Sequence, residues 1–413
     1  TYTLSDAAKA RRSELDLIRV LPELLTHMEK RPDLPLFTFW LPTEKTWKTI
    51  NVKETVEQIT RWRHALVKEG LTKGDRCAML LPNGINAILF DQSVLANALV
   101  PVPLHAVVTA GSSSYIINDS GAKLLATGRL NRWEAIRDTE DHPALKTVVI
   151  TGEPVQEHQD GDVRVVGLDQ WLTEGNGTEL PAGPEPQDLA ALVYTSGTTG
   201  KPKGVMLTDN SFNAIAQQFR AYDKLFHRGQ KLMNIMPPFI AYGYACGVHL
   251  PLVLGFTVII IPNLDPAKLG SLVLKYKPEH MFGVPAHYQQ LAADPKLRDK
   301  DLSFILNYAA GGDAIARGAE QTVNDFLAAH GVRYPIAKGS AMILHKHPDG
   351  RVWVHTGDIG YLDEDGFVYL DSRIKRLIIR HDGFKVFPSM IENVISRHPA
   401  VHQCSVVGCT DKD

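Results

Sequence analysis

The sequence has few cysteines and no cysteine pairing motif. Its 413 residues include four cysteines, Cys77, Cys246, Cys404 and Cys409, and none of them forms a Cys-x-x-Cys pair. Four thiols are too few to cross-link a chain of this length, and the missing pairs exclude the common zinc and dithiol redox motifs. We therefore predict reduced cysteines, which are typical of a cytoplasmic protein.

The sequence also lacks an excess of charge of either sign. Its 44 Lys and Arg residues nearly balance 46 Asp and Glu residues, which gives a net charge of −2. This balance gives no indication of binding to nucleic acid or to an anionic membrane. The first residues, Thr-Tyr-Thr-Leu-Ser-Asp, lack the apolar core of a signal peptide, so export is not expected.

One long stretch, from Pro237 to Pro262, contains no Asp, Glu, Lys or Arg. A membrane span needs about 20 apolar residues, so this stretch is long enough to be tested as one. His249, Pro251 and several glycines interrupt it. We predict a buried helix followed by a strand over 256–261, and no transmembrane segment.

Two familiar phosphate-binding patterns are missing as well. The Gly-x-Gly-x-x-Gly string of dinucleotide-binding folds does not occur in the chain. Gly197 and Gly200 enclose two residues, and Lys201 precedes Pro202, so the segment does not fit the P-loop pattern.

The most informative motif that is present is Tyr-Thr-Ser-Gly-Thr-Thr-Gly-Lys-Pro-Lys-Gly, residues 194–204. It follows an apolar run over 189–193 that predicts a buried strand. Glycines allow close backbone approach, hydroxyls and N–H groups donate hydrogen bonds, and lysines supply charge, so the segment can grip one polyphosphate. Composition alone leaves a flexible polar linker as the alternative. The residues assigned to the grip are Thr195, Ser196, Gly197, Thr198, Thr199, Gly200, Lys201 and Lys203.

The order of apolar segments predicts an α/β fold. Val56, Ile59, Trp62 and Leu66 recur at helical spacing before Gly70. Strand-type runs alternate with helical segments, which is typical of sheets covered by helices. The predicted strands are 77–81, 147–150, 163–166, 189–193, 257–261, 280–284 and 304–308, and the predicted helices include 211–222, 266–276 and 318–330. From residue 351 the pattern changes to hairpins, and a helix over 389–396 and a strand over 401–407 follow.

The motif at 194–204 resembles the signature of the adenylate-forming superfamily, which includes acyl-CoA synthetases, luciferases and adenylation domains of peptide synthetases. The likeness extends over essentially the whole chain and is greatest for acyl-CoA synthetases such as the fatty-acid–CoA ligases. It implies a large N-terminal domain of stacked mixed sheets and helices, residues 1–371. Residues 372–413 would be the start of a small, mobile α+β C-terminal domain, which is incomplete here.

The resemblance assigns further residues to the nucleotide and to coenzyme A. Asp358, in Thr-Gly-Asp, would accept hydrogen bonds from both ribose hydroxyls, Arg373 would contact the ribose or α-phosphate, and Lys375 would be the domain hinge. Gly311 and Gly312 would lie beside adenine, and Gly383 would line the pantetheine channel. The alternatives that stay open are an aspartate-capped turn, a solvated basic strand edge and a plain strand-to-helix turn.

The resemblance places the acid pocket at residues 236–243, with Phe239, Tyr242 and Gly243 as its lining. Amino-acid-activating relatives have an aspartate in this neighbourhood, and the segment contains none. A buried ammonium group without a carboxylate partner costs several kcal/mol, so an acid with an apolar tail is predicted. The alternative is that these aromatic side chains belong to the core.

One motif of the family is missing. Its Tyr-Gly-x-Thr/Ser-Glu string, whose tyrosine stacks on adenine and whose glutamate binds magnesium, does not occur, so no metal ligand is assigned. Residues 331–346 join two unrelated pieces and are shorter than in the family, and the family's acid-orienting lysine would lie beyond residue 413. Either residues are missing from this sequence near 336–344, or a true deletion should abolish adenine and metal binding. An intact mass equal to 45.7 kDa would exclude the first explanation.

These observations predict a cytoplasmic ligase of fatty acid metabolism that uses ATP, Mg²⁺ and coenzyme A. A carboxylic acid, fatty or otherwise apolar, would form acyl-AMP and then a thioester, with Lys203 and Arg373 as the catalytic cations. An adenylate former that loads an acyl carrier protein, or makes another acyl product, is the first alternative. An inactive nucleotide-binding protein is the second.

Overall fold

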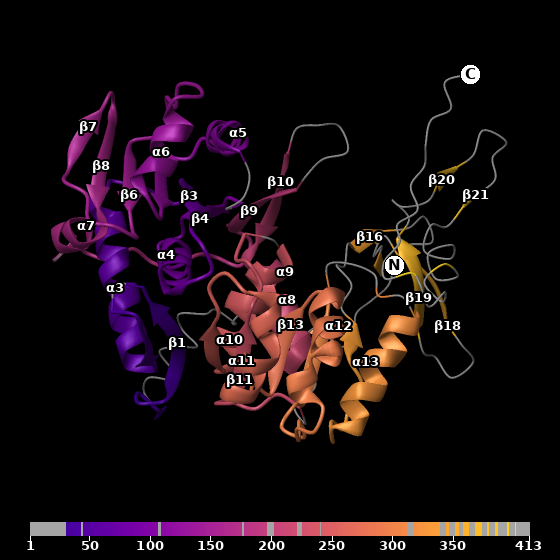
Figure 1. The fold of residues 1–413 in the computed structure, drawn as a ribbon. Coiled ribbons are helices and arrows are strands. Elements are labelled where there is room, and N and C mark those ends of the chain that lie inside the picture. The colour runs from indigo at the N-terminus through magenta and orange to yellow at the C-terminus, as the bar shows by residue number, and fades with distance from the viewer. Residues whose placement is uncertain are drawn as a thin grey trace, which may run out of the picture. The chain divides into compact units, whose positions relative to one another are not determined.

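The computed structural model describes residues 30–42, 44–105, 109–175, 177–195, 202–220, 225–239, 241–311, 315, 317–338, 344–346, 352–354, 358–362, 368–373, 378–379, 385–386, 395 and 401 (Figure 1). The chain divides into two compact units, one of residues 5–264 and one of residues 265–413 with 1–4. The predicted domain boundary at residue 371 falls inside β19 of the second unit and stays a prediction.

The first unit contains a six-stranded sheet in the order β4-β3-β5-β6-β8-β7. Its strands are β3 (Arg76–Leu80), β4 (Val100–Pro103), β5 (Leu124–Thr127), β6 (Thr147–Ile150), β7 (His158–Asp160) and β8 (Val163–Gly167). All neighbours run parallel except β7 and β8, which are antiparallel. Parallel sheets are covered on both faces, which explains why the parallel strands, unlike the polar edge strand β7, are mainly apolar and why the runs at 77–81, 147–150 and 163–166 predicted β3, β6 and β8.

Helices cover both faces of this sheet (Figure 1). They are α3 (Val52–Lys68), α4 (Ile85–Ala96), α5 (Ala110–Ser120), α6 (Leu130–Arg137) and α7 (Leu168–Glu174). On one face Ile117 of α5 and Trp133 of α6 join the core formed by alternate strand residues. A second core joins three helices, because Trp62 of α3 contacts Phe90 of α4 and Trp171 of α7 edge to face, with ring centroids 6.0 and 5.6 Å apart.

The predicted helix of residues 56–66 is confirmed as part of α3. Its start is fixed by a capping box, in which Asn51 accepts from the Glu54 N–H and the Glu54 carboxylate accepts from the Asn51 N–H. Its end follows from Gly70, which has a left-handed backbone conformation with φ of 70°.

The first unit also holds strands that pair in the order β11-β12-β1-β2, and a separate hairpin of β9 and β10. These strands are β1 (Pro35–Leu41), β2 (Thr46–Asn51), β9 (Leu189–Thr195), β10 (Lys203–Thr208), β11 (Lys231–Asn234) and β12 (Thr257–Ile260). The accompanying helices are α8 (Asp209–Arg220), α9 (Ala241–Tyr244), the π-helix η1 (Ala245–His249) and α10 (Leu250–Leu254). The uncharged stretch from Pro237 is therefore a buried helix and a strand, as predicted, and none of the helices in the described ranges is long and apolar enough to cross a membrane.

In the second unit, β13, β14 and β15 pair in parallel, and short antiparallel hairpins follow. The strands are β13 (His280–Gly283), β14 (Asn307–Ala310), β15 (Ala337–Lys338), β16 (Leu344–Lys346), β17 (Val352–Val354), β18 (Asp358–Leu362), β19 (Val368–Arg373), β20 (Ile378–Ile379) and β21 (Lys385–Val386). The helices are η2 (Pro266–Lys268), α11 (Leu269–Tyr276), α12 (Pro285–Ala293), η3 (Pro295–Leu297) and α13 (Arg317–Ala329). The predicted change to hairpins after residue 351 is confirmed.

One predicted strand is misplaced. The apolar run 304–308 predicted a strand, but β14 begins at Asn307. The residues before it form a turn in which the Ile305 N–H donates to the Leu302 carbonyl at 2.9 Å. Leu302 and Ile305 are buried through this turn, so an apolar run alone could not distinguish the turn from a strand. The predicted helix of 389–396 and strand of 401–407 lie almost wholly outside the described residues.

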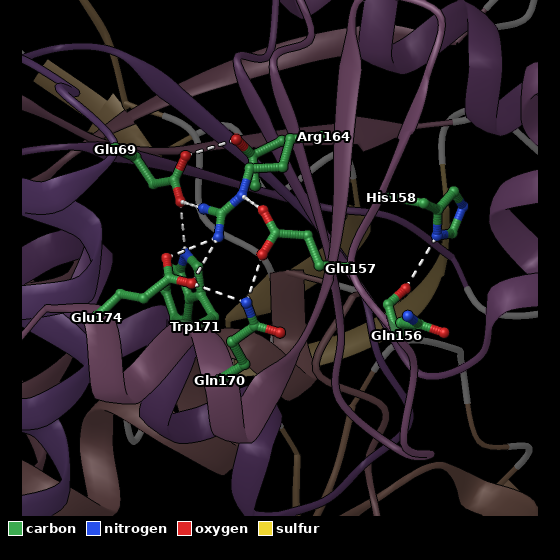
Figure 2. Close-up of polar contacts among 9 residues, drawn as sticks. Glu69, Gln156, Glu157, His158, Arg164, Gln170, Trp171 and Glu174 are labelled. Carbon is green, nitrogen blue, oxygen red and sulfur yellow. Dashed lines mark hydrogen bonds and ion pairs between the residues drawn. The ribbon is translucent and has the colours of Figure 1, made fainter.

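A network of charges joins α3, β8 and α7 in the first unit (Figure 2). Arg164 donates to Glu157 at 2.6 Å, to Glu69 at 3.1 Å and to both oxygens of Glu174 at 2.8 and 2.6 Å. Trp171 donates to Glu69 at 2.7 Å. The hydrogen bond that Arg164 donates to Glu157 is the main cause that raises the pKa of Arg164 above its usual range. The guanidinium thus connects three elements at one point of the fold.

Candidate active site

The glycine- and hydroxyl-rich motif is the connection of an antiparallel hairpin. Strands β9 and β10 pair with Thr195 opposite Lys203 and Tyr194 opposite Gly204. The segment between them carries the predicted residues Ser196 to Lys201, which lie outside the described residues. Lys203 is exposed at the base of this connection. The hairpin therefore places Thr195 and Lys203, which flank this connection, side by side.

The base of the hairpin is tied to helix α5. Tyr194 donates from its hydroxyl to Asp119 at 2.6 Å, and Tyr115 donates to the other oxygen of the same carboxylate at 3.3 Å. Burial and this carboxylate raise the pKa of Tyr194 well above its usual range. The Tyr194 ring lies against Gly204, where an added Cβ would approach the ring to 3.0 Å. Gly204 thus gives the ring the space that it needs over the opposite strand.

The second unit brings two other predicted residues together. Asp358 and Arg373 are direct partners in the β18–β19 pairing, so their Cα atoms lie across one antiparallel rung. Gly311 is buried just after β14, and its N–H donates to the Gly283 carbonyl at 2.9 Å. Gly312, Lys375 and Gly383 lie outside the described residues. Convergence of these residues with the β9–β10 hairpin on one nucleotide stays a prediction.

The predicted acid segment follows β11 in the first unit. Phe239 is half-buried, and its ring stacks on His105, with centroids 4.0 Å apart and planes inclined by 38°. Gly243 is buried at a close backbone approach, since an added Cβ would lie 2.1 Å from the Pro237 carbonyl oxygen. Only glycine fits there without a shift of the backbone. Tyr242 beside it is half-buried.

The helix after this segment widens into a π-helix at Ala245–His249. Pro251 explains part of this geometry, because it has no N–H for the carbonyl of Gly247 and its ring crowds that carbonyl in an α-helix. The N–H of Leu250 donates to the Ala245 carbonyl, five residues back. π-Helical turns are frequent at functional sites.

A buried carboxyl group contacts Tyr244, the residue just before this π-helix. Asp91 of α4 is almost completely buried and receives hydrogen bonds from the Tyr244 hydroxyl and from the Gln92 amide, the latter at 2.6 Å. Burial raises the pKa of Asp91 to about 7 and also raises that of Tyr244. Sequence reasoning missed this carboxyl because it is far from the acid segment along the chain. Both of its oxygens accept hydrogen bonds from the protein, so it offers an ammonium group no free partner.

Aromatic rings continue from this carboxyl along the helix. The Phe212 ring of α8 lies between those of Tyr244 and His249, at centroid distances of 5.2 and 5.4 Å. Burial lowers the pKa of His249 to about 4, and its Nε2 has no hydrogen-bond partner among the described residues. The imidazole is therefore neutral at pH 7 and adds no positive charge beside the helix.

Two of the four cysteines lie in the described part of the chain. Cys77 and Cys246 are buried free thiols, and burial raises the pKa of Cys246 to about 12, so it is unreactive. Cys404 and Cys409 lie outside that part. No group of three or more His, Cys, Asp or Glu side chains that could hold a metal ion occurs among the residues described.

Comparison with known proteins identifies similar chains. A family described as "AMP-binding enzyme" matches residues 24–360. The long-chain-fatty-acid–CoA ligase of Bacillus subtilis (strain 168) is 25% identical and is aligned with 95% of this chain and 83% of its own length. The fatty acid–[acyl-carrier-protein] ligase ScoC of Streptomyces coeruleorubidus is 27% identical, with 88% and 80% covered.

Solved structures share the fold. The anthranilate CoA ligase AuaEII in complex with anthranoyl-AMP superimposes with a TM-score of 0.79 at 19% identity, over 95% of this chain and 85% of that one. ATP-bound MatB from Rhodopseudomonas palustris gives a TM-score of 0.75 at 22% identity, over 94% and 85%. At these identities the likeness establishes the fold of the chain.

Proposed function

The chain belongs to the AMP-binding enzyme family, and from this membership we propose that it activates a carboxylic acid with ATP and transfers the acyl group to coenzyme A. The β9–β10 hairpin supports the proposal most strongly, because its two strands flank a segment rich in glycines, hydroxyls and lysines and pair Thr195 with Lys203. Such a connection can surround a polyphosphate with N–H, O–H and ammonium donors.

In the first step, an oxygen of the acid attacks the α-phosphorus of ATP. A phosphorus–oxygen bond forms, the bond to the β-phosphate oxygen breaks, and acyl-AMP and pyrophosphate result. Two anions must approach each other, so positive charge and in-line alignment are required. We assign the charge to Lys203 at the hairpin and to Arg373 beside Asp358, with Asp358 on the ribose. Thr195 and the connection after it hold the departing phosphates.

In the second step, a thiolate attacks the acyl carbonyl and AMP leaves. Movement of residues 372–413 about Lys375 between the two steps, with Gly383 in the thiol channel and Gly311 and Gly312 at adenine, is part of the same proposal. Mg²⁺ is expected to accompany ATP and to neutralise phosphate charge. The described residues provide no donor cluster for it, so we assign no protein ligand and no step to the ion.

The substrate class follows from the surroundings of the acid segment. The His105 ring stacks on Phe239, and Asp91 accepts hydrogen bonds from Tyr244 and Gln92. Gly243 has no side chain, and the structure has no room for one there. No described charge is available there to pair with an ammonium group, so an acid with an apolar tail is favoured over an amino acid. The long-chain-fatty-acid–CoA ligase among the relatives supports the same class. We place the enzyme in the cytoplasm.

The test is acid-dependent exchange of labelled pyrophosphate into ATP, with a panel from short acids to long fatty acids and with amino acids for comparison. We expect exchange that requires an apolar acid. Exchange with amino acids alone would reject the substrate class, and no exchange with any acid would favour an inactive nucleotide-binding protein.

A second candidate function differs only in the thiol. The ScoC relative is named as a ligase of an acyl carrier protein, which favours testing a carrier here. We expect AMP release with free coenzyme A. Release only with a phosphopantetheinyl carrier protein would assign the chain to carrier loading instead.

A further inference from the structure

Asn234, the last residue of β11, contacts the start of the acid segment at Met236 and the π-helix that follows the segment at Gly247. It is 2% exposed, and its Oδ1 accepts from the Met236 N–H at 3.2 Å. Its Nδ2 donates to the Gly247 carbonyl inside the π-helix at 2.9 Å. One side chain therefore closes a loop that contains Phe239 and Gly243. The nitrogen and the oxygen of this amide thus each bind one backbone group, one on either side of Phe239 and Gly243.

The bond to Gly247 answers a specific defect of the helix. In an α-helix the Gly247 carbonyl would accept from residue 251, but Pro251 has no N–H. A buried carbonyl without a donor costs about 1–3 kcal/mol, so a replacement donor is strongly favoured. Gly247 leaves room for it, because an added Cβ would lie 2.8 Å from Asn234 Oδ1. Asn234 and Gly247 thus act together at the site of the missing bond.

Asn83 extends the contact to the six-stranded sheet. It follows β3, is 9% exposed, and donates from Nδ2 to the carbonyl of Asn234 at 3.1 Å and to that of Ile261 at 3.0 Å. These carbonyls lie at the carboxyl ends of β11 and β12, which the Ile261 N–H joins by a bond of 3.0 Å to the Asn234 carbonyl. Ligands of α/β sheets bind at such ends.

We propose that Asn83 and Asn234 form an amide relay that fixes the acid segment, and that Asn234 is a positioning residue for the carboxylic acid. The inference rests on the proposed function, because it concerns the acid site of that reaction. Loss of the Asn234 amide frees the Met236 N–H and the Gly247 carbonyl together. The segment with Phe239 then shifts, while the β9–β10 hairpin keeps its own contacts.

The experiment measures the KM values for acid and for ATP by pyrophosphate exchange. For Asn234→Ala we expect KM for the acid to rise about tenfold and KM for ATP to change less than twofold. The double variant Asn234→Ala with Pro251→Ala supplies an N–H for the Gly247 carbonyl, and it should regain at least half of the lost acid affinity on a logarithmic scale. A residue that only stabilised the fold would not raise KM for the acid while leaving KM for ATP nearly unchanged.

Asn97 provides the matched control. It is 4% exposed, and its Nδ2 donates to the Arg63 carbonyl at 3.0 Å, away from the acid segment. Asn97→Ala should lower the urea midpoint and leave KM for the acid unchanged. If Asn234→Ala does not fold, Asn83→Ala should still raise KM for the acid severalfold.

Two results would overturn the relay. Asn234→Ala, or Asn83→Ala in its place, could leave KM for the acid unchanged, or the double variant could show no recovery. A wild-type protein without any acid-dependent exchange would instead overturn the proposed function, so the two failures are distinguishable.

Discussion

Two polar regions of the first unit use opposite chemistry. At the amino-terminal edge of the six-stranded sheet, which we term the ion-pair edge, Lys123 pairs with Asp75 at 2.9 Å and Arg164 pairs with three glutamates. The amide region, which consists of Asn83, Asn234, Asp91 and Tyr244, is nearly free of permanent charge and more deeply buried.

The difference follows from access to water. Arg164 keeps 22% of its side chain exposed, so its ion pairs retain part of their hydration. The amide region has no such access, and an unpaired charge there would cost several kcal/mol. Neutral amide side chains therefore donate hydrogen bonds to the Gly247 carbonyl, which Pro251 leaves without its α-helical donor, and to the backbone carbonyls at the strand ends. A region without permanent charge next to the acid segment also suits the apolar tail of an acid. An uncharged substrate tail is therefore expected at the amide region and not at the ion-pair edge.

The largest expected effect is on catalysis at the hairpin. Lys203→Ala should reduce the exchange rate by about 10²–10³, because its charge is assigned to the phosphates. Lys146→Ala, beside Thr147 at the ion-pair edge, is the control and should leave the rate unchanged. Equal rates for Lys203→Ala and wild type would remove Lys203 from the site.

The second prediction concerns the charge of the amide region, because Asp91 ionises there as pH rises. Asp91 has a pKa of about 7 when folded against 3.8 in its ordinary state, so the folded protein binds the proton more tightly. The protonated Asp91 side chain therefore contributes fully to the free energy of unfolding at low pH, and this contribution is lost as pH rises from about 4 to 7. The free energy of unfolding of wild type relative to Asp91→Asn should therefore fall by about 3 kcal/mol between pH 5 and 8. Urea unfolding across this range measures it. His249, whose buried neutral form has the opposite dependence, is common to both proteins and cancels. A flat difference would show that Asp91 is ionised throughout.

A third variant tests the ion-pair edge alone. Arg164→Ala leaves Glu69, Glu157 and Glu174 without their common cation, so we expect a loss of about 1–3 kcal/mol in the free energy of unfolding. The KM for the acid should not change. Arg137→Ala is the control, since Arg137 pairs with Asp160 while 42% exposed and should lower the free energy of unfolding far less than Arg164→Ala does. A raised acid KM in Arg164→Ala would join the two regions functionally and end the contrast between them.

The smallest effect sharpens the role of the hairpin base. Tyr194→Phe removes only the hydroxyl that donates to Asp119, so we expect KM for ATP to rise about fivefold, which corresponds to about 1 kcal/mol. The KM for the acid should stay constant. Tyr115→Phe removes the other, longer bond to the same carboxylate and is the control. If both variants raise KM for ATP equally, the effect comes from the Asp119 carboxylate and not from the position of the hairpin.

Local patterns predicted much of the fold. The helical spacing of Val56 to Leu66 and the stop at Gly70 gave α3, and the apolar run 147–150 gave β6 as observed. Strand β10 was not predicted, because Lys203 to Thr208 alternates poorly and has only three consecutive apolar residues. Its identity as a strand comes from pairing with β9, a contact that local pattern does not encode.

The sequence alone determined the family-like motifs, the sheets covered by helices and the absence of an aspartate within the acid segment. Only the tertiary structure decided which distant groups meet: Asp91 with Tyr244, Asn83 with Asn234, and Asp119 with Tyr194. A motif records the chemistry of neighbouring residues, whereas a buried polar group takes its partner from whichever element folding brings within about 3 Å. The missing N–H of Pro251 is visible in the sequence, but the Asn234 amide that compensates for it is visible only in the fold.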